Sequence, residues 1–427
     1  MARTLLAAAV ASLALAAPAQ ADYGDDCAPL GSQVQTTVCH GADVVSRDAA
    51  AATADHGPAV AAHEASWTHD ALAFQHALGD AVPLRNAQWV GTHNSFNSIA
   101  EMGPALSVMD SNQQLSLVDQ LRVDVRSLEL DVHWFPSPRG GGMAPVVCHA
   151  QEGAGCSAEK LLGETLRPIG AWLRAHRDQV LLLYLENQLR GEEGSNAAAA
   201  AIEAELGDLV HRPKGPAGTC VDLPGETTRA DVLAAGRQVL IVSNCGAGAA
   251  WRSWSFGWSD HEETRPRNYS CHADFDQATH DRAIVRYFED DTWLTSAASN
   301  TGAASRDDGI DAETAAEMIR CGVDLLGMDQ LTADDARLDA LVWSWAQGED
   351  VGAGCAALRP ADGRWTAERC ATKRHFACRS ASGFTLTAKR LRGDRPPAGC
   401  GAPRTGYENE QARAAADGRS VWLALPS

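Results

Sequence analysis

The chain has 427 residues, enough for two or three domains, and a formal net charge of −19. Charge of this sign argues against nucleic acid as a partner, because nucleic-acid binding depends on basic surfaces that neutralise phosphates. The same charge repels anionic membranes at long range. Any approach to a lipid surface therefore requires that the acidic residues lie away from the contact or bind cations.

Residues 1–21 have the features of a secretory signal peptide. Arg3 supplies a positive start, an apolar run extends over Leu5–Ala17, and Ala19-Gln20-Ala21 is a small-x-small cleavage motif. The run is too short for a membrane anchor, which needs about 20 apolar residues. We therefore expect a secreted protein, and no later segment is long and apolar enough to cross a membrane.

The chain has 12 cysteines, and this even number fits an oxidising compartment and a set of disulfides. The sequence does not fix the pairing. Short separations favour three pairs, namely Cys27–Cys39, Cys148–Cys156 and Cys355–Cys370. A zinc site is the alternative use of cysteine, but no Cys-x-x-Cys pair occurs, so disulfides are the better interpretation.

Residues 22–85 form an N-terminal leader, in which Ala42–Ala62 is rich in Ala and Asp and is expected to be poorly ordered. From Ala87 to about Leu331, apolar runs alternate with helix-like segments. The expected strands are 87–92, 125–132, 145–149, 179–186, 237–244 and 323–329, with weaker candidates at 208–212 and 265–272. Apolar periodicity predicts helices over Ala158–His176 and Ala312–Arg320.

Strands that alternate with helices predict an α/β fold with a parallel sheet and right-handed crossovers. Residues 86–335 approach the roughly 250 residues of a (β/α)8 TIM-type barrel, so we expect such a barrel, regular or irregular. Residues 340–427 differ in character and predict a small disulfide-bonded α+β module. They contain four cysteines together with Trp343, Trp345, Trp365 and Trp422.

The segment Trp251–Trp258 places four aromatic residues within eight positions. The simpler interpretation is a loop whose rings cover the barrel. The alternative is a loop that touches a membrane or grips a substrate, since Trp favours interfaces. We favour the covering loop.

Polar side chains able to bind metal or move protons end four of the expected strands. In chain order they are His93 and Asn94, Glu129 and Asp131, His149, and Glu186. Because the carboxyl ends of parallel barrel strands meet at one edge, we expect these side chains to gather there. A lone histidine is more often a packed core residue, but four such strand ends predict an active site.

These pieces resemble the X region of phosphoinositide-specific phospholipase C and the wider PLC-like phosphodiesterase superfamily. The resemblance rests on the motif Gly-Thr-His-Asn-Ser at 91–95, on Arg-x-x-Glu-x-Asp at 126–131, and on the later strand-end His and Glu. It covers residues 87 to about 190 well and the rest of the barrel by fold alone. It implies that His93 bonds the phosphate and stabilises its charge, and that His149 is the acid that protonates the departing alkoxide.

Calcium-dependent members of this family bind their ion through an Asn after the first His, the Glu and Asp of Glu-x-Asp, and a later Glu. The calcium-independent bacterial branch has Asp after the first His and Arg near the Glu-x-Asp position. The resemblance therefore implies the calcium-dependent type, with Asn94, Glu129, Asp131 and Glu186 as ligands.

Ca²⁺ prefers about six to eight oxygen ligands, so these four side chains leave room for water, a phosphate oxygen and a sugar hydroxyl. The neighbouring hydroxyl of an inositol would attack its own phosphodiester, release diacylglycerol and leave a cyclic phosphate. Glu129 or Glu186 would take the proton, and the sequence does not choose between them.

Two further residues flank the Glu-x-Asp motif. Arg126 lies three residues before Glu129, so in a strand it points to the opposite face, which favours a structural role such as a salt bridge. His133 shares the alternation phase of Glu129 and Asp131. It either points into the site or is a loop residue beside Trp134.

Asp329 closes the apolar run Val323–Met328. If that run is the last strand, it adjoins the first, and Asp329 would orient His93 as an acidic residue does in the family. We find no clear counterpart of the basic and aromatic residues that hold phosphorylated inositols in animal phospholipases. Arg265, Arg267 and Tyr269 are candidates by position only, so unphosphorylated phosphatidylinositol or another phosphodiester is the expected substrate.

The spacing Gly-Arg-Trp-x4-Cys-x7-Cys at 363–378 resembles the C-terminal half of a C-type lectin-like domain, and residues 393–425 resemble its N-terminal half, in permuted order. The resemblance implies the pairs Cys355–Cys370 and Cys378–Cys400. Thr366 and Ala367 replace the Asn-Asp pair of sugar-binding members. Carbohydrate binding through calcium is therefore doubtful, and a structural or protein-binding role is favoured.

The sequence thus predicts a secreted, calcium-dependent phosphodiesterase with transient membrane contact and a lectin-like appendage. The nearest alternative is a glycerophosphodiesterase or sphingomyelinase D-like enzyme of the same superfamily. Those enzymes place their Glu-x-Asp closer to the first His than the 36 residues that separate His93 from Glu129. A catalytically silent binding protein is the other alternative, and the presence of both histidines and all four ligands argues against it.

Overall fold

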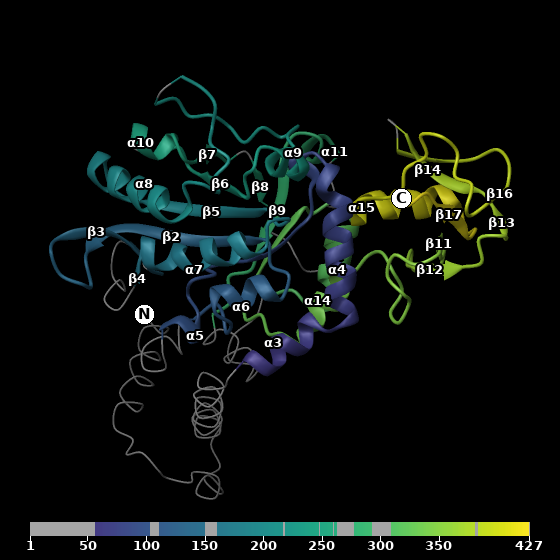
Figure 1. The fold of residues 1–427 in the computed structure, drawn as a ribbon, viewed down its shortest axis with the longest axis horizontal. Helices are drawn as coiled ribbons and strands as arrows, with labels where there is room; N and C mark the ends of the chain where they lie inside the picture. The colour runs from purple at the N-terminus through teal and green to yellow at the C-terminus, as the bar shows by residue number, and fades with distance from the viewer. Residues whose placement is uncertain are drawn as a thin grey trace, which may run out of the picture.

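The structure is a computed structural model, and it describes residues 56–102, 111–149, 160–216, 218–246, 248–258, 260–262, 277–292, 309–380 and 383–426. A curled sheet flanked by helices forms the larger part, and a smaller module lies at the C-terminal end, with helix α4 between them (Figure 1). Several predictions lie outside the described residues: the signal peptide 1–21, the pair Cys27–Cys39, Cys156, and the candidate strand 265–272 with Arg265, Arg267 and Tyr269.

The main sheet pairs its strands in parallel along the order β7-β6-β5-β2-β1-β10-β9-β8. The strands are β1 Trp89–Thr92, β2 Ser127–Pro136, β5 Leu181–Gln188, β6 Val239–Ser243, β7 Phe256–Gly257, β8 Asp260–Glu262, β9 Ile284–Phe288 and β10 Leu325–Met328. β6 and β10 are buried at every residue, as parallel strands covered on both faces are. The predicted α/β class and parallel sheet are confirmed.

The sheet curls irregularly between β7 and β8. These two strands follow each other in the chain, yet β7 pairs with β6 and β8 pairs with β9. One segment therefore extends both edges of the curled sheet, and no pairing joins β7 to β8 among the described residues. The regular alternation of strand and helix in a (β/α)8 barrel is interrupted here.

Two strand predictions are wrong in detail. Of the predicted strand 145–149, only residues 145–147 are in a strand, β3 (Met143–Val147), which is antiparallel to β2 and forms a hairpin with it. Residues 208–212 form no strand, and Val210 makes only an isolated bridge to Val239. The sequence patterns also miss β9, because Arg286 interrupts its short apolar run.

The helices of the sheet region cover its faces. They are α5 Ile99–Met102, α6 Leu117–Arg122, α7 Leu162–Ala175, α8 Glu192–Leu206, α9 Arg229–Ala234, α10 Ala249–Arg252, α11 Gln277–His280, α13 Ala312–Arg320 and α14 Ala336–Leu341, with the short strand β4 Lys160–Leu161 before α7. α7 and α13 confirm the two helices predicted from periodicity. In the part of the chain that the structure describes, every helix is too short or too polar to traverse a lipid bilayer.

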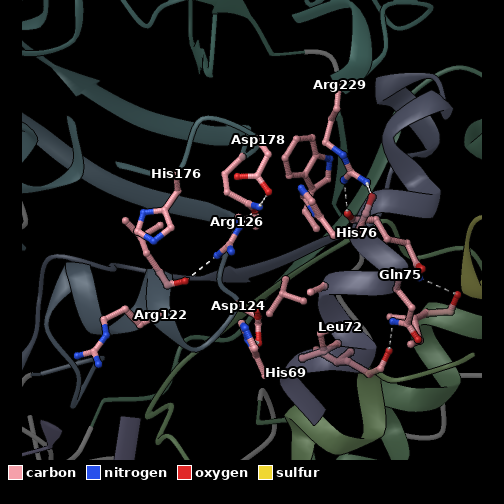
Figure 2. A pocket seen from close by; sticks show the side chains of 18 of the residues that line it. His69, Leu72, Gln75, His76, Arg122, Asp124, Arg126, His176, Asp178 and Arg229 are labelled. Atoms are coloured by element: carbon pink, nitrogen blue, oxygen red, sulfur yellow. Dashed lines mark hydrogen bonds and ion pairs between the residues drawn. The ribbon is translucent and has the colours of Figure 1, made fainter. Parts of the chain in front are cut away.

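The end of the leader is an ordered part of the fold. It forms α3 Gly57–Glu64 and α4 Trp67–Leu78, then the 3-10 turns η1 Gly79–Ala81 and η2 Leu84–Asn86. The expectation of poor order is therefore wrong for residues 57–62. Beside α4, where the parallel strands begin, lies a cavity of about 360 Å³ (Figure 2).

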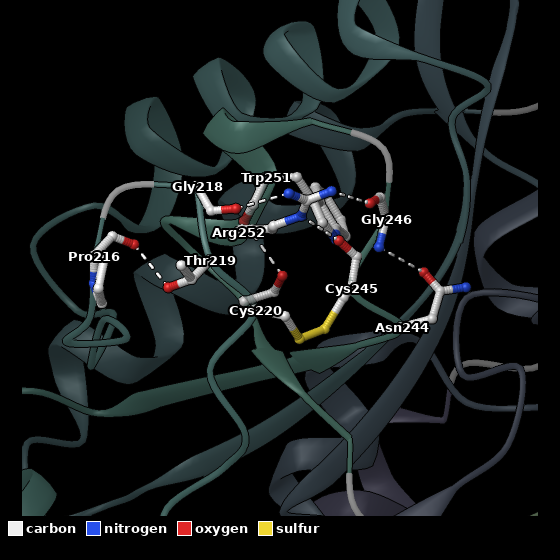
Figure 3. Close-up of a disulfide and its surroundings, with 10 residues drawn as sticks. Pro216, Gly218, Thr219, Cys220, Asn244, Cys245, Gly246, Trp251 and Arg252 are labelled. Carbon is white, nitrogen blue, oxygen red and sulfur yellow. Dashed lines mark hydrogen bonds between the residues drawn. A yellow bond between two sulfur atoms is a disulfide. The ribbon is translucent and has the colours of Figure 1, made fainter.

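The aromatic segment 251–258 covers the sheet, as its simpler interpretation predicts, since Trp251 and Trp254 are only 0% and 4% exposed. Arg252 fixes the segment by donating hydrogen bonds to three backbone carbonyls around it. A disulfide between Cys220 and Cys245 lies directly beneath (Figure 3). Short sequence separation does not favour this pair, whose cysteines are 25 residues apart.

The C-terminal module is a small α+β unit. Its elements are β11 Cys355–Leu358, β12 Trp365–Glu368, β13 Lys373–Arg374, β14 Phe376–Ser380, β15 Gly383–Leu386, β16 Leu391–Arg392, α15 Gly406–Ala416 and β17 Val421–Leu423. Its larger sheet has the order β12-β11-β17-β14-β15. The predicted disulfides Cys355–Cys370 and Cys378–Cys400 are both present.

Trp365 joins the module to the rest of the protein. Its ring lies edge-on to Phe74 of α4 at 6.1 Å, to Trp343 at 5.6 Å and to Trp345 at 5.9 Å. The indole N–H donates to Oδ1 of Asn409 on α15 at 2.8 Å. The module is thus docked by a buried aromatic cluster in which the Trp365 indole N–H is satisfied.

We expect Trp365→Ala to lower the free energy of unfolding by about 3–5 kcal/mol, because Trp365 is 0% exposed and its loss leaves a cavity at the junction. Urea denaturation of the full chain measures this. Met143→Ala is the matched control, since Met143 is 47% exposed and its truncation should cost less than about 0.5 kcal/mol. A cost for Trp365→Ala as small as that of the control would contradict a docking role.

Candidate active site

A polar pocket of about 1000 Å³ lies at the edge where the parallel strands end. The described residues that line it are His93, Asn94, Glu129, Asp131, His149, Tyr184, Glu186, Gln188, Glu262, Arg286, Phe288, Glu289 and Asp290. All six predicted strand-end residues are among them. The parallel register explains most of this convergence, since β1, β2 and β5 are neighbours.

His93 is oriented by the last parallel strand. β10 pairs with β1, as the sequence predicts, so Asp329 lies beside His93 with its Oδ2 at 3.4 Å from Nδ1 of the ring. The Asn94 amide donates to Nε2 of the same ring at 3.2 Å. This arrangement leaves the proton of the neutral imidazole on Nδ1, facing Asp329. Phe288 stacks on the ring at 5.6 Å between centroids.

Asp329 is itself held by several donors. Its Oδ2 accepts from the backbone N–H of Asp291 at 2.7 Å and from Asn112 at 3.0 Å, and its Oδ1 accepts from Gln113 at 3.1 Å. Burial by itself lowers the pKa of His93, but the charge and hydrogen bond of Asp329 outweigh it, so the pKa is raised. His93 therefore holds a proton more readily than a solvated histidine.

Three carboxylates meet opposite His93. Glu129 and Asp131 lie on one face of β2, and the β2–β5 register places Glu186 next to Asp131. One carboxylate oxygen from each lies within 4.8 Å of the other two. Burial and the mutual repulsion of these charges raise the pKa of Glu129 and raise that of Asp131 to about 6. Three carboxylates this close together require bound protons or a cation to offset their mutual repulsion.

The hydrogen bonding around this cluster favours a cation. The backbone N–H of Asn94 donates to Oε2 of Glu129 at 2.8 Å, and Asn94 takes a left-handed φ of 43° to do so. Oδ1 of Asn94 and Oε1 of Glu129 are buried acceptors with no donor among the described residues. Buried acceptors without partners are costly, and amide and carboxylate oxygens are the ligands of hard divalent cations. The donor set therefore fits Ca²⁺.

His149 reaches the pocket by a different route from the one predicted. It follows β3, which is antiparallel to β2, so the hairpin rather than a parallel strand end delivers it to the pocket. Its charge acts on Asp131 and lowers the pKa of that carboxyl. His93 therefore follows a parallel strand and His149 follows an antiparallel one, and both border the acidic cluster.

Arg126 and His133 lie away from the pocket lining. Arg126 donates to the carbonyls of Leu121 and Val125 and to the Gln179 amide, so its role is structural, but it forms none of the ion pairs found between described residues. His133 is buried further along β2, and its Nε2 has no partner among the described residues. Burial lowers its pKa. The alternation of side chains along β2 places His133 on the same face as Glu129 and Asp131, but His133 does not border the pocket.

The sequence patterns miss one wall of the pocket, formed by Tyr184, Arg286 and Phe288. Arg286 forms ion pairs with Asp260 and Glu262, and its guanidinium lies 4.6 Å from the Phe288 ring centroid. Burial raises the pKa of Tyr184 to about 12, so its phenol keeps a donor proton at neutral pH. The alternation in Ile284–Phe288 places Arg286 and Phe288 on one face and is the signal that would have found them.

A family model described as the Rv2075c PI-PLC-like domain matches residues 50–335. The uncharacterized protein Rv2075c of Mycobacterium tuberculosis H37Rv is 38% identical over 381 residues, which cover 82% of this chain and 78% of that protein. The uncharacterized protein MT2135 of the CDC 1551 strain gives the same values. This chain belongs to the Rv2075c PI-PLC-like family.

The similarity of this chain to solved phospholipase C structures is low, in both sequence identity and TM-score. The phosphatidylinositol-specific enzyme of Listeria monocytogenes is 14% identical, with a TM-score of 0.41, over 63% of this chain and 96% of that one. A calcium-dependent phosphoinositol-specific phospholipase C from a Pseudomonas species is also 14% identical, with a TM-score of 0.35, over 61% of this chain and 92% of that one.

We expect calcium affinity to weaken as pH falls through about 6, because Asp131, whose pKa is raised to about 6, must lose its proton to bind the ion. Titration calorimetry should find binding about tenfold weaker at about pH 5 than at about pH 7.5. Without metal, the raised pKa makes the folded state lose stability as pH rises from about 4 towards 6, and calcium should offset that loss. Affinity that does not change over this range would place calcium elsewhere.

We also expect Asp329→Asn to lower the pKa of His93, because the substitution removes the negative charge that outweighs the burial of the ring. Titration of the imidazole by NMR measures this directly. Asp178→Asn is a matched control, since Asp178 borders the cavity at the opposite end of the sheet. The same pKa in Asp329→Asn and in the wild type would show that Asp329 does not act on His93.

Proposed function

We propose that this protein is a calcium-assisted phosphodiesterase that cleaves phosphatidylinositol, or a closely related phosphodiester, by the phospholipase C mechanism. One observation carries the proposal: two histidines border the same pocket as a partly buried acidic cluster, where Glu129 and the adjacent Asn94 have oxygen acceptors without partners among the described residues. Membership of a PI-PLC-like family supports the same reaction class.

Asn94, Glu129, Asp131 and Glu186 would hold the ion. Bound Ca²⁺ would lower the pKa of an adjacent sugar hydroxyl and neutralise charge on the phosphate. Glu129 and Glu186 are the candidate bases for the hydroxyl proton. Glu186 is the more exposed of the two, whereas Glu129 is buried and already accepts from the Asn94 N–H, so Glu186 is the more accessible base.

The two histidines would have different roles, His93 at the phosphate and His149 at the leaving group. His93, whose pKa is raised beside Asp329, would carry a second proton on Nε2 in place of the hydrogen bond from Asn94, and this N–H would bond a phosphate oxygen and stabilise its growing charge. The attacking hydroxyl oxygen forms a bond to phosphorus, and its proton passes to the carboxylate base. The bond from phosphorus to the glycerol oxygen breaks, and His149 supplies that oxygen with a proton. The products are a cyclic inositol phosphate and diacylglycerol.

The charge of the pocket favours a headgroup with a single negative charge. Six of its described lining residues are carboxylates, and Arg286 is the single arginine or lysine among them. Arg286 is moreover paired with Asp260 and Glu262. Additional phosphates on the substrate would meet uncompensated negative charge, so we favour an unphosphorylated inositol, whose hydroxyls can donate to the carboxylates.

We further propose that the protein is secreted and that its C-terminal module is lectin-like. Three disulfides, Cys220–Cys245, Cys355–Cys370 and Cys378–Cys400, support folding in an oxidising compartment. The buried position of Trp365 at the junction supports a structural role for the module rather than sugar binding.

The test is cleavage of phosphatidylinositol micelles by the purified protein, with calcium and then with chelator, followed by ³¹P NMR of the released cyclic inositol phosphate. We expect release only with calcium. His93→Ala and His149→Ala should each lose about 10²- to 10⁴-fold in rate, the usual contribution of a positioned acid or base. His176→Ala is the matched control, because this histidine lies at the opposite end of the sheet and should leave the rate unchanged.

A second substrate separates the two histidines. An inositol phosphodiester with a good leaving group, such as p-nitrophenol, needs no acid, so His149→Ala should recover most of its rate on it while His93→Ala should not. Wild-type activity in either variant on phosphatidylinositol would contradict the two-histidine mechanism. Cleavage of glycerophosphodiesters or sphingomyelin instead would assign the site to the alternative enzyme class, and no cleavage of any of these would favour a binding role.

A further inference from the structure

A second group of potential metal ligands lies at the opposite end of the sheet from the active site. It consists of His63 on α3, His69 on α4 and Asp124, which precedes β2. One donor atom from each residue lies within 4.8 Å of the other two. This group is separate from Glu129, Asp131 and Glu186 at the carboxyl ends of the strands.

The two imidazoles converge on one carboxylate oxygen. Nε2 of His63 and Nδ1 of His69 lie 2.8 Å and 3.0 Å from Oδ2 of Asp124. The two rings are 5.9 Å apart and inclined by 70°, so their nitrogens approach the carboxylate from different directions. The other oxygen of Asp124 accepts no hydrogen bond from the described residues.

The backbone of Asp124 indicates that this arrangement is strongly imposed. Its φ is 71°, in the left-handed region that non-glycine residues adopt only at a cost. The side chain is buried, as is that of His63. A strained backbone and a buried carboxylate persist only where the surrounding contacts fix them, and here the contacts that fix the carboxylate are the two histidines.

The donor set and its spacing suit zinc. Two imidazole nitrogens and one carboxylate oxygen are a common protein ligand set for Zn²⁺, with bonds of about 2.0–2.2 Å. Tetrahedral ligands at that distance lie about 3.3 Å apart, so separations of 2.8 and 3.0 Å need to open by less than 1 Å. The two imidazole nitrogens lie within 4.8 Å of each other, so they need to approach by at most about 1.5 Å to take the same spacing.

The surroundings supply the remaining requirements of a metal site. His69 and Asp124 border the cavity of about 360 Å³ shown in Figure 2, which gives room for a water or small anion as a fourth ligand. Glu64 lines the same cavity and acts electrostatically on His69. Arg126 is the opposing charge nearby, and its guanidinium is already bound to two carbonyls and Gln179.

We propose that His63, His69 and Asp124 form a zinc site that fastens α3 and α4 to the base of the sheet. The three ligands come from three segments that meet only in the folded chain, so the ion would join the end of the leader to the loop before β2. The site is independent of the proposed phosphodiesterase function.

The test uses the full chain without a polyhistidine tag, stripped with a chelator and then given calcium at about millimolar concentration to fill the acidic cluster. Zinc is added, excess is dialysed away, and bound metal is counted by mass spectrometry. A chromophoric chelator then gives the affinity, and Co²⁺ substitution reports tetrahedral geometry from its visible spectrum. We expect one zinc per chain.

His69→Ala should weaken zinc binding by more than about 100-fold, since even outer-shell partners contribute about 10- to 100-fold. The His69 side chain is 29% exposed, so its truncation should leave the fold intact. Asp124→Asn should act in the same direction. His176→Ala is the matched control, because its ring borders the same cavity but stacks on Trp172 outside the ligand group, and it should bind zinc normally.

Asp131→Asn separates the two metal sites, since it should weaken calcium binding and leave zinc unchanged. The proposal is overturned if the wild type retains no zinc, because the three residues are then only a hydrogen-bonded group. It is also overturned if His69→Ala, or His69→Gln where the first variant does not fold, binds zinc as the wild type does.

Discussion

The pairing of β2 with β5 brings Glu129, Asp131 and Glu186 together in a partly buried setting and so concentrates negative charge at one edge of the sheet. The group does not stabilise the fold, because like charges in a low-dielectric site raise one another's pKa and oppose folding. The Asn94 N–H and the Gln188 amide donate to two of these carboxylates, but Oε1 of Glu129 and the neighbouring Oδ1 of Asn94 remain buried acceptors without a donor among the described residues. Carboxylates held together at a cost in stability, with strongly perturbed pKa values, are typical of a functional site rather than of packing.

The sequence predicts this site well because the relevant information is local. Each of its carboxylates directly ends or lies within a run of apolar residues, and the alternation of side chains along a strand decides which face it occupies. The order of the strands then follows from the preference of parallel sheets for neighbouring pairs. Glu129, Asp131 and Glu186 therefore meet without any long-range signal in the sequence.

Other parts of the site depend on contacts that no local pattern records. Asn112 and Gln113 bind Asp329 from a loop that has no apolar periodicity, so nothing in their sequence marks them. His149 is correctly predicted to line the same pocket, but the strand before it is antiparallel to its neighbour. A short apolar run does not indicate the direction in which a strand pairs, so the sequence could not show this. Arg286 conceals β9, because a charged residue in a short strand removes the apolar run that identifies it.

The helices α4 and α14 link the active site to the C-terminal module. The Arg337 guanidinium on α14 binds Oε2 of Glu289 at 2.6 Å and the Asp329 carbonyl at 2.8 Å, and Glu289 accepts from the Asp329 N–H at 2.6 Å. At the other end of α14, the Leu341 carbonyl accepts from Gln75 of α4 at 3.1 Å.

The Gln75 side chain carries this connection into the module. Its carbonyl oxygen accepts from the backbone N–H groups of Trp343 and Ser344 at 2.7 and 2.9 Å, next to the ring of Trp365. One buried amide thus ties α4 to the chain that enters the module, and the same helix pair holds the Asp329 backbone beside His93. Because these bonds are buried, none can be lost without leaving a polar group unpaired. The module and the pocket edge of the sheet therefore share one support, built from α4 and α14, and the fully buried Trp365 docks the module against it.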